Sequence, residues 1–178
     1  MRQHREGAPA DWLRAALLVA GSGAGGGLLA DRSQRRPELT RAAGTYVLLL
    51  SLPQTTPLVI GRLGAFDFPA GWYTYVGSAF GPGGLRGRLS HHLAPVTKPH
   101  WHIDHLRQAA ICREVWFTAD EISREHDWAT ALRTSPGASM PAPRFGASDC
   151  ACPTHLIHFA DKPDLTAILG GEIVGQVV

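Results

Sequence analysis

Two cysteines and a histidine stand close together near the end of the chain, within residues 150–155, CACPTH. Thiolate sulfur and imidazole nitrogen are ligands that zinc prefers, and a structural zinc takes four of them in a tetrahedron. Cys150, Cys152 and His155 would supply three. His126, on a predicted helix, could supply the fourth, so the sequence predicts a structural zinc site.

Two alternatives to this zinc site remain open. The Cys-x-Cys spacing is tighter than the usual structural-zinc pattern, and small buried cysteines are common in protein cores. His100, His102 and His105 are alternative ligands, although histidines three apart on a helix are more often polar surface or phosphate-contacting residues. A catalytic zinc at this cluster would also need an open metal position and a base, and the sequence offers no convincing base.

A basic pair lies on a predicted helix that follows a glycine-rich loop. Leu85, Leu89 and Leu93 recur every four residues and predict a helix that ends before Pro95. Arg88 and His92 then share one flank of this helix. The planar guanidinium of Arg88 suits phosphate oxygens, and the alternative is an ordinary solvated charge.

A carboxylate is predicted to face inward on a later helix. The pattern Thr118-Ala-Asp-Glu121 is that of a capping box, which predicts a helix start there. On this helix Ile122, Ala129 and Leu132 mark the buried side, and Glu125 and His126 share it. A carboxylate that faces the core needs a functional reason, and the alternative is an exposed, paired helix residue.

The elements that must position these residues are short strands and helices. Apolar or alternating runs predict strands at 45–52, 58–63, 72–77, 114–117 and 154–159, and a further helix after Pro99. Short turns between the first three strands predict an antiparallel meander. The fold class is therefore α+β (mixed α/β), a small antiparallel sheet flanked by helices.

Composition sets the outer bounds. With 178 residues, 44% hydrophobic and 18% charged, the chain suits one globular domain, and a net charge of +2 permits a nucleic-acid partner without requiring one. Three cysteines form no disulfide framework, so we expect a cytoplasmic protein.

The apolar segment 12–20 is bounded or interrupted by Asp11 and Arg14 and is too short to span a membrane, so no membrane partner is expected. Residues 1–40 are predicted to be a flexible extension, 41–160 the domain and 161–178 a C-terminal tail.

Several short motifs follow one another along the chain, namely 44–46 (GTY), 68–71 (FPAG), 75–77 (YVG), 81–85 (GPGGL), 85–89 (LRGRL), 100–104 (HWHID), Glu125 and 148–152 (SDCAC). Together they resemble the signature of the GIY-YIG nucleases. The closer resemblance is to a poorly characterised branch of that family, found alone or fused to endonuclease III-like glycosylases.

The resemblance implies a metal-dependent endonuclease that hydrolyses phosphodiester bonds of nucleic acid, expected to be DNA in a repair setting. Tyr75, rather than Tyr46, would be the general base, although a free phenol has a pKa near 10 and needs help to ionise. Arg88 would clamp phosphate and Glu125 would bind Mg²⁺ or Mn²⁺. His92 would bond a phosphate oxygen or shuttle a proton. The expected substrate-binding residues are Gly77, Ser78, Gly83 and Gly84.

The chain departs from the wider family at two points. Many relatives carry lysine where this chain has Ser78, so one cationic phosphate contact is missing, and the spacing from Tyr46 to Tyr75 is longer than usual. The alternative function is therefore a non-catalytic nucleic-acid-binding module that keeps the fold and a structural zinc. At the His126 position relatives tend to carry cysteine, an exchange that zinc tolerates.

Overall fold

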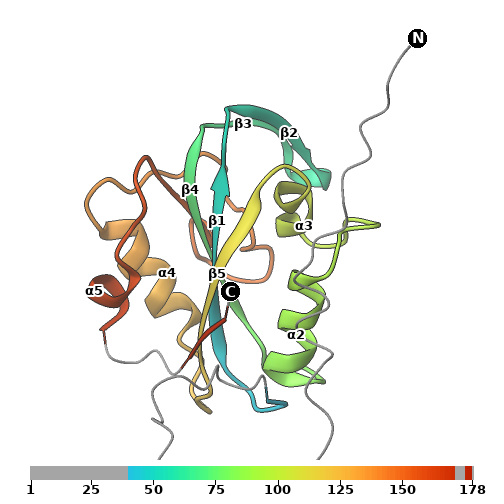
Figure 1. The fold of residues 1–178 in the computed structure, drawn as a ribbon, viewed down its shortest axis with the longest axis vertical. Helices are drawn as coiled ribbons and strands as arrows, with labels where there is room; N and C mark the ends of the chain where they lie inside the picture. The colour runs from blue at the N-terminus through green and yellow to red at the C-terminus, as the bar shows by residue number, and fades with distance from the viewer. Residues whose placement is uncertain (1–39, 171–174, 178) are drawn as a thin grey trace, which may run out of the picture. The chain divides into compact units, whose positions relative to one another are not determined.

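The computed structural model describes residues 40–170 and 175–177 (Figure 1), so the predicted extension over 1–40 lies outside the described residues except for Thr40. The elements in chain order are β1 (Thr45–Leu52), β2 (Thr56–Ile60), the 3₁₀ turn η2 (Gly61–Leu63), β3 (Gly64–Phe68), β4 (Gly71–Ser78), α2 (Gly84–Leu93), α3 (His102–Arg107), β5 (Ile111–Thr118), α4 (Glu125–Thr134), β6 (Leu156–Phe159), α5 (Leu165–Leu169) and β7 (Gly175–Val177).

The main sheet is antiparallel and has five strands in the order β6-β4-β1-β5-β7, which confirms the α+β fold class. The predicted meander of the first three strands is wrong. β1 pairs directly with β4, while β2 and β3 form a separate two-stranded sheet. The chain reverses at Gly61 and Gly64, both at positive φ, so the predicted strand 58–63 is split by a turn.

Both faces of the sheet are covered, which explains the unbroken apolar run of β1. Tyr46, Leu48 and Leu50 pack in the same core cluster as the buried side chains of α2 and α3. Val47 and Leu49 pack with those of α4 and α5. Helices therefore lie on both sides of β1 (Figure 1), and a strand in this setting needs apolar residues at every position.

The predicted capping box at Thr118 is wrong. Thr118 is still paired with Thr45 in the sheet, and α4 begins seven residues later at Glu125, after Arg124 with no side-chain cap. Ile122, predicted to be buried, is 64% exposed. The start of α4 is attached instead by the Arg124 amide, which donates to the Thr45 hydroxyl over 2.9 Å.

Residues 161–178, predicted as a C-terminal tail, contribute two elements to the fold. α5 packs on the α4 side of the sheet, and β7 pairs with β5 at the sheet edge. Among the described residues, no helix combines the length and apolarity required to cross a membrane.

Candidate functional site

One open pocket of about 370 Å³ collects six of the nine residues predicted for catalysis and substrate binding. The residues that line it are Tyr46, Tyr75, Gly77, Ser78, Arg88, His100, Trp101, His102, Glu125, Gly146, Ser148 and Asp149. The predicted members come from β1, β4, α2 and α4, so the fold brings together side chains up to 79 positions apart, Tyr46 and Glu125. The residues without a predicted catalytic role come mainly from the HWHID and SDCAC motifs.

The two tyrosines share one face of the sheet because β1 and β4 pair in a fixed register. Tyr46 lies opposite Gly77, and Tyr75 lies opposite Leu48. A Cβ at Gly77 would overlap the hydroxyl and ring of Tyr46. Gly77 therefore has a steric role that its prediction as a substrate contact did not include: it lets Tyr46 lie across β4.

Neither tyrosine is readily ionised by the protein alone. Burial raises the pKa of Tyr46 and of Tyr75 above the ordinary value. The Glu125 carboxylate raises the pKa of Tyr75 further, and Arg88 opposes both increases. A cation beside Glu125 is therefore what would favour phenolate at Tyr75.

His92 lies behind the pocket. It is 1% exposed, and its Nε2 is 2.7 Å from the Tyr46 hydroxyl. Burial, followed by the nearby Arg107 charge, lowers the pKa of His92 to about 3, so the ring is neutral. The predicted phosphate contact is therefore indirect in this geometry: His92 can reach a substrate only through Tyr46.

Arg88 is held in place by an aromatic ring. Its guanidinium carbon lies 4.6 Å from the centre of the Trp101 ring, within cation–π range. The Trp101 amide in turn donates to the buried carboxylate of Asp104 over 3.0 Å. The HWHID motif thus fixes the orientation of the only Lys or Arg among the described lining residues.

The glycine-rich loop before α2 is occupied by the chain itself. The amides of Leu85 and Arg86 donate to the carbonyls of Ala42 and Thr40, over 2.9 and 2.8 Å. A Cβ at Gly84 would overlap the backbone at Arg41 and Ala42. Gly83 and Gly84 do not line the site pocket, which differs from their predicted substrate contact, because this turn is built to pack on residues 40–42.

Glu125 and Asp149 provide two carboxylates to the pocket. The negative charge of each carboxylate raises the pKa of Tyr75, so both act on the same hydroxyl. Carboxylate oxygens are hard ligands, and Mg²⁺ is commonly held by one or two of them together with water and phosphate. The donor set therefore fits Mg²⁺ or Mn²⁺. Asp149 is not among the metal ligands that the sequence predicts, although it lies within the SDCAC motif.

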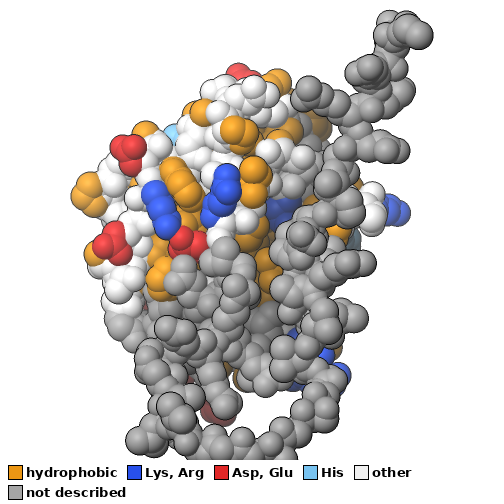
Figure 2. All heavy atoms as spheres, in the orientation of Figure 1, with side chains coloured by type: hydrophobic (Ala, Val, Ile, Leu, Met, Phe, Trp, Pro, Cys, Tyr) orange, Lys and Arg blue, Asp and Glu red, His pale blue; other side chains and the backbone are white. Residues whose placement is uncertain are grey.

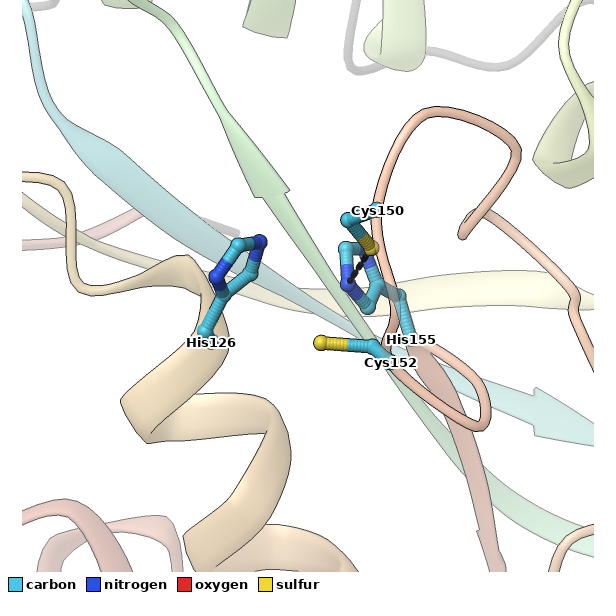
Figure 3. Close-up of side chains that lie close together, drawn as sticks. All are labelled: His126, Cys150, Cys152 and His155. Atoms are coloured by element: carbon cyan, nitrogen blue, oxygen red, sulfur yellow. Dashed lines mark hydrogen bonds between the residues drawn. The ribbon is translucent and has the colours of Figure 1, made fainter.

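The Cys/His cluster lies beside this pocket. His126 at the start of α4 converges with Cys150, Cys152 and His155 (Figure 3), and one ligand atom of each lies within 4.8 Å of the others. The alternative ligands do not belong to it. His100 and His102 line the site pocket, and His102 Nδ1 accepts from the Gly146 amide, while His105 lies near Gly61.

Side-chain charge is mixed on the face shown in Figure 2. Lys and Arg side chains there are interspersed with acidic and apolar ones, and the described residues form no continuous basic area on this face. This face therefore offers no extended basic surface for a polyanion among the described residues.

The fold and pocket define an α+β domain with a tyrosine pair, an arginine and a glutamate in one pocket, and this agrees with the resemblance inferred from the sequence. The chain belongs to the family described as a domain of unknown function, DUF123, a GIY-YIG-like family whose model matches residues 45–173. The match extends from β1 through α5. No curated protein and no solved structure matches the chain.

Proposed function

We propose that this chain is a metal-dependent endonuclease that hydrolyses phosphodiester bonds in DNA. The observation that carries the proposal is that Tyr46, Tyr75, Arg88 and Glu125, from four separate elements, line one open pocket. Phosphodiester hydrolysis needs a base, a cationic contact to the phosphate and a metal ligand, and this set supplies all three.

Tyr75 is the better placed of the two tyrosines to act as the general base. Its hydroxyl feels Glu125 as the strongest charge around it. The Tyr46 hydroxyl, by contrast, is hydrogen-bonded to His92. A divalent cation bound through Glu125 would supply positive charge that neutralises the phosphate and favours ionisation of a nearby hydroxyl or water. Tyr46 then orients the neighbouring groups.

Arg88 binds the phosphate as a fixed cation. A guanidinium stays positively charged in proteins, so Arg88 can act only as an electrostatic contact and not as a proton donor or base. The Trp101 ring restricts where the guanidinium can lie, so less side-chain freedom is lost when phosphate binds.

The test is incubation of the purified full chain with end-labelled duplex, flapped, branched and single-stranded DNA, with and without Mg²⁺ or Mn²⁺. Glu125→Ala should abolish metal-dependent cleavage, and Arg88→Ala should slow it about 10²-fold to 10³-fold. Arg62→Ala, which changes an exposed arginine outside the pocket, is the matched control and should cleave normally. Undiminished cleavage by Glu125→Ala would refute the proposed site.

The second candidate function is a nucleic-acid-binding module without turnover. Ser78 stands where many GIY-YIG nucleases carry lysine, and Arg88 is then the only cation among the described residues of the pocket. Binding to every DNA substrate without cleavage, in either metal, would favour this candidate over the nuclease.

A further inference from the structure

The Cys/His cluster has the composition of a tetrahedral zinc site, and one pair of its ligand atoms has the spacing of such a site. Cys150 Sγ lies 3.4 Å from His155 Nε2. Zn–S and Zn–N bonds of about 2.3 and 2.0 Å would place such a pair about 3.5 Å apart around a tetrahedral zinc. All three cysteines among the described residues are free thiols, so no disulfide competes for Cys150 or Cys152. Two thiolates also balance the charge of one Zn²⁺.

The loop that carries the two cysteines is held in shape without a metal. Arg144 donates from one guanidinium nitrogen to the carbonyls of Cys150 and Cys152, over 2.8 and 2.9 Å. Arg144 is also the only described non-glycine residue at positive φ, 64°. The two hydrogen bonds hold the carbonyls of Cys150 and Cys152 toward Arg144. The two thiols converge with His126 and His155 (Figure 3).

His155 faces two sites at once. Its Nε2 points into the cluster at Cys150, while its Nδ1 lies 3.3 Å from Oε1 of Glu125. The ring is 1% exposed, and Nδ1 has no well-aligned hydrogen-bond partner among the described residues. Within the described part of the chain, Glu125 is the charged group that pairs with that nitrogen, and it also lines the site pocket.

We propose that His126, Cys150, Cys152 and His155 bind a structural zinc ion, and that His155 positions Glu125 as the outer carboxylate of this site. A metal on Nε2 leaves the ring hydrogen on Nδ1, where it can only be donated toward Glu125. Carboxylate–histidine–zinc arrangements of this kind orient the ligand and strengthen metal binding. The zinc site stands on its own, whereas the consequence for cleavage rests on the proposed nuclease function.

Zinc content and geometry are measured first, without nucleic acid. Full chain purified without chelator should contain about one equivalent of zinc, and the double variant Cys150→Ser, Cys152→Ser should lose it. Because that variant can misfold, wild-type protein is also stripped and refilled with Co²⁺. The visible bands of tetrahedral cobalt and a thiolate-to-cobalt charge-transfer band are expected. A folded, metal-free wild type that gives neither band overturns the site.

The link to Glu125 is tested by competition for zinc with a chromophoric chelator. Glu125→Ala should weaken zinc binding about 10-fold to 100-fold, and Glu125→Gln, which keeps an acceptor oxygen, should recover much of the loss. Glu121→Ala, an exposed carboxylate on the preceding segment, is the matched control and should bind as wild type does. Equal affinities in all four proteins would overturn the link. Absence of cleavage with intact zinc binding would refute the nuclease and leave this inference standing.

Discussion

Substitution of Asp104 by Asn should destabilise the domain because Asp104 is a buried carboxylate that holds the HWHID segment. Its side chain is 1% exposed and accepts hydrogen bonds from the His100 and Trp101 amides at 3.0 Å and from Arg107 at 3.2 Å. Removing one partner of a buried ion pair typically costs about 3–5 kcal/mol. Because Asn retains one acceptor oxygen, we expect the free energy of unfolding to fall by about 3 kcal/mol, which corresponds to a fall in Tm of about 10 °C.

The sign of the pH dependence follows from the pKa of Asp104. Burial alone would raise this pKa, but the hydrogen bonds from the Trp101 and His100 amides and from His91 outweigh it, so the pKa lies below its ordinary value. A carboxylate of this kind stabilises the fold above its unfolded pKa, near 3.9, and loses that contribution as pH falls through its folded pKa. The difference between wild type and Asp104→Asn should therefore be constant near neutrality and shrink below about pH 4.

Chemical denaturation of both proteins between pH 3 and pH 7 measures this difference. Asp67→Asn, which changes an exposed carboxylate on β3, is the matched control and should alter stability by less than about 0.5 kcal/mol. A loss in Asp104→Asn as small as that of the control would refute the role assigned to Asp104. So would a difference that grows toward acid.

Two further predictions concern the residues around Tyr46. Gly77→Ala should lower the free energy of unfolding by about 1–3 kcal/mol and slow cleavage, because the new methyl group overlaps the Tyr46 hydroxyl. Gly81→Ala is the matched control, because no atom lies within 4 Å of a Cβ there and Gly81 is not at positive φ. Equal stabilities of the two variants would contradict the steric argument. His92→Phe should reduce the loss of folding stability at low pH. In the unfolded wild type His92 gains a proton below about pH 6.5, whereas in the folded protein the buried ring stays neutral down to about pH 3. Denaturation at pH 7 and pH 5 should show a wild-type loss of up to about 2 kcal/mol that the variant lacks, and parallel losses would refute it.

The parts of the fold that the sequence predicts well are those governed by local patterns. The apolar run 45–52 and the leucine repeat from Leu85 appear as β1 and α2. Among the pocket residues, helical periodicity singles out Arg88 and Glu125, whereas Tyr46 and Tyr75 are predicted only through the motif resemblance. Composition alone did not indicate that β1, β4, α2 and α4 meet at one point.

The parts that the sequence does not predict depend on long-range pairing. Gly77 is predicted only as a substrate contact. Its steric role depends on Tyr46, which is 31 positions away and becomes its cross-strand partner only in the sheet. The sequence gives no reason to single out Asp149, because its loop and Tyr75 come together only in the folded structure. Gly84 likewise resembles a phosphate-binding glycine until residues 40–42 occupy the amides of the same turn.

The misplaced start of α4 shows why such errors matter for function. A helix that began at the predicted capping box would place Glu125 about two turns inside it, on a face set by helical periodicity alone. In the structure β5 keeps Thr118 in the sheet, and α4 starts at Glu125 itself. The first two helical residues can then serve different sites. Glu125 lines the pocket and His126 joins the Cys/His cluster, with His155 in contact with both. A shift of this helix start should therefore disturb the proposed cleavage and the proposed zinc binding together, as Glu125→Ala should.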